Sequence, residues 1–334
     1  MMRRRLGRDG PEIFPLGVGT MSFSPVYGEV SEEQCHAVLD AALDLEIDHI
    51  DTANIYGMGL SEEVIGRFLE RYRTKGGIPF RIATKAGNCR GRGSGNSPFD
   101  NSPEHLEAEL DRSLIRLGIE RVCLFYVHRR DPRFEIEEVT DTLANLVKKG
   151  KIEHIGFSEI APSSLRRAAA INHVAAVQSE YSLQTRLPEL GLVQACEQLG
   201  TALVAFSPVG RGLLTDDPPN PDRVAQSSFL SVNPRFVGRN LPRNLKASEP
   251  LREIARKIDR PAAAVAIAWL LARSPVVVPI PGTRSADHLR ELAAGCVLEL
   301  SNELLEQIES LMPPGWAHGP RYSESQSVGP EQYC

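Results

Sequence analysis

The sequence predicts an α/β fold: eight short parallel strands that alternate with helices and close into a (β/α)8 barrel of the TIM-barrel type. Short apolar runs alternate with helix-type periodicity along the whole chain, which is typical of either a closed barrel or a long doubly wound sheet. A doubly wound dinucleotide-binding sheet should carry G-x-G-x-x-G after its first strand, but residues 21–25 read MSFSP. Gly91, Gly93 and Gly95 lack the spacing of the third glycine and are interpreted as a solvated loop. The missing motif favours the barrel.

The eight predicted strands are brief and rich in β-branched residues, as strands buried on both faces require. They span residues 16–20, 47–52, 81–85, 122–128, 154–158, 175–178, 202–207 and 276–280.

Capping residues mark the helices between these strands. Ser31 heads a capping box, Ser61 is expected to cap a helix over 62–71, and Ser102 precedes Pro103 at a first helical position. Helix ends are marked by glycines that follow apolar-periodic segments: Gly118, Gly150 and Gly200.

Additions to the alternating pattern are expected at three places. A short hairpin is predicted at the N-terminus, before the first barrel strand. Residues 210–245 are predicted to form a Pro/Asn/Arg-rich loop, followed by two extra helices over 249–259 and 261–273. Residues 312–334 read as an irregular tail. No linker interrupts the pattern, so residues 1–334 are expected to form a single domain.

Composition excludes several classes of protein. With 42% hydrophobic and 24% charged residues in 334, the chain can bury a large core, and a net charge of −5 argues against nucleic acid as a partner. No run reaches the roughly 20 apolar residues of a membrane span. The six cysteines form no C-x-x-C pair and no zinc-type spacing with histidine, so no metal site is expected. Scattered thiols fit a reducing compartment, and we expect a cytoplasmic protein.

Four titratable residues fall at or just beyond the ends of three successive predicted strands. Asp51 ends the second strand with Tyr56 five residues on, Lys85 ends the third, and His128 ends the fourth. Taken singly, each has an ordinary explanation as a cap, a solvated strand end or a packing residue. Because catalytic groups of β/α barrels lie at the carboxyl ends of the strands, their joint placement predicts a common site.

The chemistry of these four side chains suits protonation of an oxygen. A free phenol has a pKa of about 10, and the Lys85 ammonium is expected to lower that of Tyr56. Asp51 can keep Lys85 charged and oriented, while a neutral His128 can hydrogen-bond a carbonyl oxygen. No Ser or Cys nucleophile is predicted beside a base.

Seven segments, each at a predicted strand end, make the chain resemble the aldo-keto reductase superfamily over nearly its whole length. They are DTANIYG (51–57), TK (84–85), VHR (127–129), GFSE (156–159), VQSEYS (177–182), FSPVGRG (206–212) and IPGTR (280–284). The Ser-Glu pair at 158–159, where Ser-Asn is common, is similar to the branch that includes pyridoxal reductases and perakine reductase. The resemblance implies a β/α barrel, hydride transfer from NADPH (NADP+ in its oxidised form), and a catalytic tetrad of Asp51, Tyr56, Lys85 and His128.

The resemblance also implies positions that bind the cofactor. Ser158 and Gln178 match groups that hydrogen-bond the nicotinamide carboxamide, Phe206 matches a stacking aromatic, and Arg284 matches a group that binds the 2′-phosphate. The remaining cofactor positions are Thr20, Glu159, Ser207, Gly210, Gly212, Gly282, Thr283 and His288. Two departures concern the adenine end, where many members carry Arg or Gln in place of His288 and Asn in place of Leu292. These departures leave the strength of the preference for NADPH over NADH open.

The expected function is therefore NADPH-dependent reduction of an aldehyde or ketone to the alcohol. The substrate walls are expected to include Phe23, Tyr27, Asn88 and Arg129. Two alternatives use the same fold: an NADPH-binding regulatory subunit with little turnover, and a Schiff-base lyase that uses Lys85. The expected partner is a small carbonyl compound, and the chain is expected to be a monomer or a weak homo-oligomer. Substrate, stereochemistry and oligomeric state stay undecided at this level.

Overall fold

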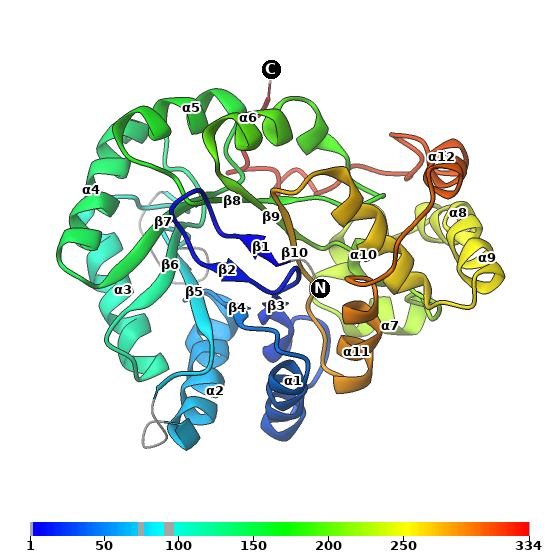
Figure 1. Ribbon diagram of the computed structural model, residues 1–334, viewed down its shortest axis with the longest axis horizontal. Coiled ribbons are helices and arrows are strands. Elements are labelled where there is room, and N and C mark those ends of the chain that lie inside the picture. Colours follow the sequence, from blue (N-terminus) through cyan, green and yellow to red (C-terminus); the bar gives the residue numbers. More distant parts are fainter. Residues whose placement is uncertain (1–2, 73–76, 90–96, 334) are drawn as a thin grey trace.

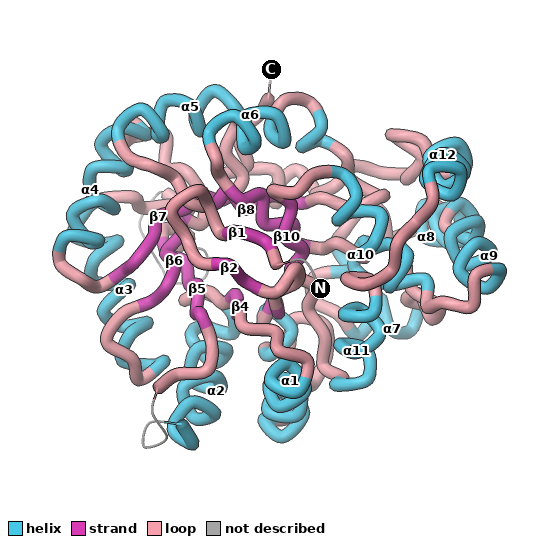
Figure 2. The backbone as a smooth tube through the Cα atoms, in the orientation of Figure 1, coloured by secondary structure: helices cyan, strands magenta, loops and turns pink. Residues whose placement is uncertain are grey.

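Eight parallel strands form one sheet at the centre of the molecule, and helices surround it. The computed structural model describes residues 3–72, 77–89 and 97–333. Figure 2 shows the strands gathered inside a ring of helices. The sheet comprises β3 Val18–Gly19, β4 His49–Asp51, β5 Arg81–Ala86, β6 Val122–Val127, β7 Ile152–Ser158, β8 Ala176–Glu180, β9 Ala202–Phe206 and β10 Val277–Ile280. All eight predicted strands are confirmed.

The sheet closes on itself between its first and last strands. Each strand pairs in parallel with the next, in the order β3 to β10. The amides of Gly17 and Gly19 then donate to the carbonyls of Pro279 and Pro281, both at 2.9 Å. A Cβ at position 19 would lie 2.7 Å from the Ile280 carbonyl oxygen, so the seam requires glycine there. This seam confirms the predicted barrel.

An N-terminal hairpin covers the end of the barrel where the strands begin. Strands β1 (Arg4–Arg5) and β2 (Glu12–Ile13) pair antiparallel and lie across the near end of the barrel in Figure 1. Leu6 and Ile13 are fully buried and pack with strand residues such as Leu124 and Val204. The hairpin thus fills the barrel floor with apolar side chains, and the prediction of a short hairpin is confirmed.

The main core lies between the strands and the surrounding helices, as expected for two packed layers. The helices are α1 Glu32–Asp44, α2 Leu60–Leu69, α3 Pro103–Leu117, α4 Ile136–Lys148, α5 Pro162–Ile171, α6 Leu192–Leu199, α7 Pro221–Gln226, α8 Asn240–Ala247, α9 Glu249–Lys257, α10 Ala262–Arg273, α11 Ala286–Ala294 and α12 Asn302–Leu311. Within the described ranges, no helix has the length and apolar character needed to cross a membrane.

Most predicted caps are confirmed, and one is wrong. Ser31 forms the capping box of α1, Ser102 caps α3, and glycines end α3, α4 and α6 in the left-handed conformation. Helix α2, however, is preceded by Gly59 and contains Ser61 in its first turn. The Ser61 hydroxyl is fully buried and donates to Thr20, 3.0 Å from its carbonyl oxygen, because the helix start packs directly on the end of β3.

The long connection after β9 is more ordered than predicted. Residues 210–245 were expected to be a loop, but they contain α7 and the start of α8. The two extra helices, α9 and α10, are confirmed, and residues 313–333 contain neither helix nor strand, as predicted. The stretch with Gly91, Gly93 and Gly95 lies outside the described residues.

Candidate active site

The four predicted catalytic side chains meet at one end of the barrel. Asp51 ends β4, Lys85 lies near the end of β5, and His128 directly follows β6. Tyr56 begins the 3-10 turn η2 (Tyr56–Gly59) between β4 and α2. Because the strands are parallel neighbours, their carboxyl ends share one edge of the barrel. Asp51, Lys85 and His128 are buried, and Tyr56 is half-buried.

Direct contacts link the members of this tetrad. The Lys85 ammonium donates to the Asp51 carboxylate and, at 2.7 Å, to the Thr52 carbonyl. It also lies 3.5 Å from the Tyr56 hydroxyl oxygen. The Tyr56 and His128 rings meet edge to face, with centroids 5.9 Å apart. A phenol, an ammonium and an imidazole therefore share one small volume.

The electrostatics agree with the sequence for two residues and correct it for a third. Burial lowers the pKa of Lys85, but Asp51 and Tyr56 outweigh it, so its pKa is raised and the ammonium stays charged. Burial, with help from Arg129 and Lys85, holds the pKa of His128 well below its usual value, so the imidazole is neutral. The lowered pKa expected for Tyr56 is wrong. Burial of the phenol outweighs the nearby ammonium, and the pKa of Tyr56 is raised.

Two residues predicted to bind cofactor hold Asp51 in place. The Gln178 side-chain amide donates to the Asp51 carboxylate at 2.8 Å. The Thr20 hydroxyl donates to the Asp51 carbonyl at 3.0 Å and is fully buried. Thr20 is thus a support beneath the tetrad with no surface to offer a ligand in this structure.

The other predicted cofactor positions follow the ends of β7 to β10. Ser158 ends β7 and Phe206 ends β9. The loop after Phe206 has left-handed backbone at Ser207, Gly210 and Gly212. A Cβ on Gly210 would lie 2.9 Å from the side-chain oxygen of Gln184. The buried side-chain amide of Gln184 makes no hydrogen bond within the described chain. The amides of Gly210 and Gly212 are used within the loop, at 2.9 Å to the Ser207 carbonyl and 3.1 Å to the Val209 carbonyl. The lack of side chains at these two positions and the unsatisfied Gln184 side-chain amide fit the close approach of a dinucleotide phosphate.

Positions 282–288 lie beyond β10. The Arg284 guanidinium donates to the Glu29 carbonyl at 2.9 Å, and the Thr283 hydroxyl accepts from the Ser285 amide at 3.1 Å. Gly282 and His288 are exposed. Arg284 and His288 are therefore positioned at the rim, where an anionic group can reach them.

Glu159 differs from the other cofactor positions because its carboxylate is already engaged. Arg321 donates to both of its oxygens, at 3.0 and 2.6 Å, and the Glu180 amide donates to one of them at 2.9 Å. The backbone at Glu159 is left-handed, with φ of 57°. The Ser-Glu pair that departs from the common superfamily pattern thus anchors the C-terminal segment.

The predicted substrate walls fall in different environments. Phe23 is 1% exposed and packs in the main core, so it offers almost no surface to a ligand. Tyr27 packs on Phe229, with ring centroids 6.2 Å apart, and Asn88 bridges to Phe99. Arg129 is half-buried beside His128.

A buried ionic cluster near the tetrad was missed by sequence reasoning. Arg211 grips Glu180 through two hydrogen bonds of 2.8 and 2.7 Å, and Arg235 and Arg321 lie 3.7 and 4.0 Å from the same carboxylate. Its members come from β8, the loop after β9, the connection before α8 and the tail. Arg211 is visible in the sequence of the glycine loop, but no local pattern indicates that Glu180 is its partner.

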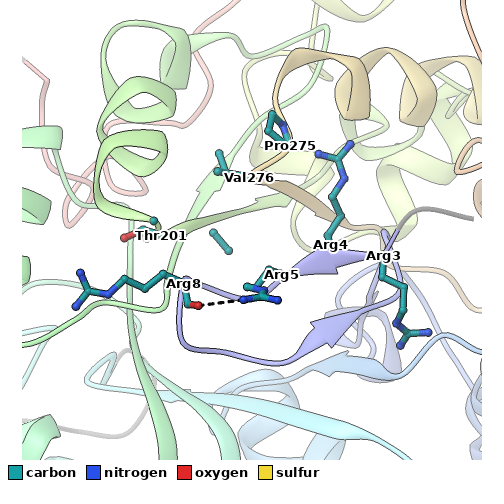
Figure 3. A pocket seen from close by; sticks show the side chains of 10 residues that line it. Arg3, Arg4, Arg5, Arg8, Thr201, Pro275 and Val276 are labelled. Carbon is teal, nitrogen blue, oxygen red and sulfur yellow. Dashed lines mark hydrogen bonds between the residues drawn. The ribbon is translucent and has the colours of Figure 1, made fainter.

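Two of the hollows in the described part of the molecule lie at opposite ends of the barrel. Figure 3 shows the first, of about 320 Å³, between the hairpin and the start of β9 and β10, where Arg3, Arg4, Arg5 and Arg8 line it. It lies at the strand ends opposite the tetrad, so it is not the candidate active site. The second, of about 340 Å³, lies between the loop after β6 and the tail segment from Val328 to Glu331.

One group of side chains has metal-ligand chemistry that spacing did not reveal. Cys123, Glu153 and His154 place ligand atoms within 4.8 Å of one another, because β6 and β7 are paired neighbours. Glu153 is already paired with Arg121 at 3.1 Å, and the group lies near the start of the strands, away from the tetrad.

Comparison with known proteins identifies the class to which this barrel and its site belong. The model of the Aldo/keto reductase family matches residues 15–313. The chain is 35% identical over 322 residues to aldo-keto reductase yakc, NADP(+), of Schizosaccharomyces pombe, covering 96% of this chain and 94% of that one. It is also 35% identical over 300 residues to aldo-keto reductase str7 of Strobilurus tenacellus, covering 89% and 86%.

Solved structures agree. The glycerol dehydrogenase AKR11B4 of Gluconobacter oxydans superposes with a TM-score of 0.78 at 26% identity, covering 93% of this chain and 96% of that one. The holo form of AKR11C1 of Bacillus halodurans gives 0.76 at 25% identity, covering 97% and 99%. The chain belongs to the aldo/keto reductase family and is an oxidoreductase.

Proposed function

We propose that this protein reduces an aldehyde or ketone to the alcohol with NADPH as cofactor, and that Tyr56 protonates the carbonyl oxygen. The contact between the Tyr56 hydroxyl and the charged Lys85–Asp51 pair, beside a neutral His128, carries the proposal. The printed name of the S. pombe relative includes NADP(+), which supports the cofactor. NADPH, when bound, supplies the hydride.

The tetrad can hold and release one proton at the phenol oxygen. The raised pKa of Tyr56 keeps the phenol protonated at neutral pH, so the proton is present before the reaction. As the carbonyl oxygen gains negative charge it takes this proton, and the Lys85 ammonium stabilises the phenolate left behind. Asp51 keeps Lys85 charged, and the neutral His128 can donate a hydrogen bond that orients the carbonyl oxygen.

Residues around the tetrad would hold the cofactor. Ser158 and Gln178 would bind its carboxamide, Phe206 would stack on its nicotinamide ring, and Arg284 would bind its 2′-phosphate. Ser207, Gly210 and Gly212 after β9, together with Gly282 and Thr283 after β10, would lie along its phosphates, and His288 would lie at the rim.

The phenol's role is tested by Tyr56→Phe. Steady-state reduction of a panel of aromatic and aliphatic aldehydes is followed through the absorbance of the reduced nicotinamide. General acid catalysis contributes about 10²–10⁴-fold, so we expect kcat/KM to fall by at least about 100-fold. NADPH affinity, measured by fluorescence titration, should not change. Undiminished turnover would refute the role of Tyr56.

The same preparations separate the two alternatives. Bound NADPH with negligible turnover of the whole panel would favour a regulatory subunit. Covalent tagging of Lys85 after borohydride reduction with substrate would favour a Schiff-base enzyme. The Lys85–Asp51 pair opposes the latter, because a nucleophilic amine must be neutral and this ammonium is held charged.

A further inference from the structure

Among the residues that the structure describes, Arg129 has no carboxylate partner, whereas its arginine neighbours do. On its own loop, Arg130 pairs with Glu331 at 3.2 Å and Arg133 pairs with Asp131 at 2.5 Å. In the buried cluster, Arg211, Arg235 and Arg321 all lie within ion-pair distance of Glu180 or Glu159. Within the described ranges, no aspartate or glutamate pairs with Arg129.

The hydrogen bonds of Arg129 leave one edge of its guanidinium open. Its Nη1 donates to the His128 carbonyl at 2.6 Å and to the Ser158 hydroxyl at 3.2 Å. Its Nε and Nη2 donate to no atom of residues 3–72, 77–89 or 97–333. These two nitrogens lie side by side on the planar group and present parallel N–H donors, the arrangement that binds both oxygens of one carboxylate.

The open edge is held beside the reacting groups. Arg129 directly follows His128, and its charge lowers the pKa of both His128 and Tyr56. Its aliphatic stem runs under the tail, where a Cβ on Gly329 would lie 3.2 Å from Arg129 Cδ. Arg129 is half-buried, and neither Nε nor Nη2 is a buried atom, so a ligand can reach the open edge.

We infer that Arg129 selects carbonyl substrates that carry a carboxylate, which it binds through its Nε and Nη2 while Tyr56 and His128 contact the carbonyl oxygen. The inference rests on the proposed reductase function and names its substrate class. Arg284 offers a parallel, since within the described part of the chain its side chain donates to the Glu29 carbonyl and to no carboxylate, and it is proposed to bind an anionic phosphate.

The test compares 3- and 4-carboxybenzaldehyde with their methyl esters. For each acid and ester, kcat/KM is measured with the wild type and with Arg129→Met, and the acid-to-ester ratio is formed for each enzyme. Intrinsic differences in aldehyde reactivity cancel between the two enzymes. Because charge-assisted hydrogen bonds are lost, we expect the acid-to-ester ratio to be about 10–100-fold lower in Arg129→Met for the better-fitting isomer. The change should come mainly from a higher KM for the acid.

Two controls separate this role from others. Arg166→Met removes the same charge from an exposed site on α5 and should leave the ratio unchanged. Raising the salt concentration should lower the wild-type ratio by screening. An unchanged ratio in Arg129→Met would overturn the inference, as would equal losses for acid and ester together with weaker NADPH binding, which would assign Arg129 to the cofactor. If wild type reduces neither compound nor any aldehyde of the wider panel, it is the reductase proposal that fails.

Discussion

A single buried ion pair, Lys85 with Asp51, determines the chemistry of the site. Both side chains are essentially inaccessible, at 0% and 2% exposure, so the pair has lost its hydration. Breaking a buried pair by removing one partner leaves an uncompensated charge, at a cost of about 3–5 kcal/mol. Hydrogen bonds from Gln178 and Thr20 to Asp51 fix the position of this residue.

We therefore expect Asp51→Asn to lower the free energy of unfolding by about 3–5 kcal/mol, because the Lys85 ammonium stays buried without its counter-charge. Urea unfolding followed by circular dichroism measures the change. Asp217→Asn is the matched control, since its pair with Arg223 is exposed and should contribute less than about 1 kcal/mol. Equal effects of the two substitutions would show that the Lys85–Asp51 pair does not carry this energy.

At the scale of residues, the sequence predicted which side chains meet but not how burial acts on them. Asp51, Lys85 and His128 follow from strand ends, which periodicity reveals. The pKa of Tyr56 depends on how completely the phenol is desolvated, and that depends on residues distant in sequence. Glu159 was predicted at a cofactor position, yet its partner Arg321 lies 162 residues away.

The C-terminal tail is an element with no secondary structure that is nevertheless tightly held. Arg321 binds Glu159, and the Trp316 indole donates to the Leu183 carbonyl at 2.8 Å. Glu331 accepts from Arg130 at 3.2 Å and from the Ala161 amide at 2.8 Å. Residues 313–333 form no helix or strand, and their internal hydrogen bonds are confined to short turns such as the one from the Gln326 amide to the Ser323 carbonyl. Contacts with the barrel therefore supply most of the order of this segment.

Arg321→Met should release this segment without unfolding the barrel. We expect hydrogen exchange and limited proteolysis between residues 313 and 333 to become faster by at least about 10-fold, because a lost buried charge pair exceeds 1.4 kcal/mol. Arg290→Met serves as the control, since its partner Asp287 is exposed on α11. Unchanged protection of the tail would show that the other contacts suffice.

Elements with a strong local pattern were predictable, and those that depend on packing were not. Strands buried on both faces stand out as short β-branched runs, and all eight were found. Ser61 carries a side chain typical of helix caps, but the start of α2 is determined by its packing on β3. The Ser61 hydroxyl therefore donates to Thr20 and does not cap the helix. The short helices α7 and α8 lie in a Pro/Asn-rich stretch whose composition favours a loop.

At the scale of the whole molecule, buried and partly buried histidines make stability depend on pH. Burial lowers the pKa of His49, His128, His154 and His173 in the folded chain. The unfolded chain binds protons at these groups below about pH 6.5, and this binding stabilises the unfolded chain but not the folded one. Stability should thus be fully present above about pH 6.5 and fall as the pH falls below it.

Urea unfolding between pH 8 and 5 tests this expectation. Each fully buried histidine should contribute up to about 1.4 kcal/mol per pH unit below pH 6.5. His128→Gln should reduce the slope of the unfolding free energy against pH by the equivalent of up to one proton. The wild-type profile is the comparison. A flat profile across this range would contradict the lowered pKa values.

The choice between barrel and open sheet also belongs to this scale. Counting strands leaves both possible, because each strand's neighbours in sequence are the same in the two folds. The strictly sequential strand order excludes a doubly wound sheet, whose order reverses at its centre. The hydrogen bonds from Gly17 and Gly19 to Pro279 and Pro281 then close the ring, and each of these partners lies 262 residues away.

The side chains of Leu6 and Ile13 close the end of the barrel that lies opposite the tetrad. Strand residues of the same cluster, such as Leu124 and Val204, fill the interior, so the barrel is a packed core and not a channel. Under the proposed reductase function, the cofactor and the carbonyl compound would both have to reach the tetrad from the rim where the strands end. The molecule that lies deeper would then have to bind first and leave last.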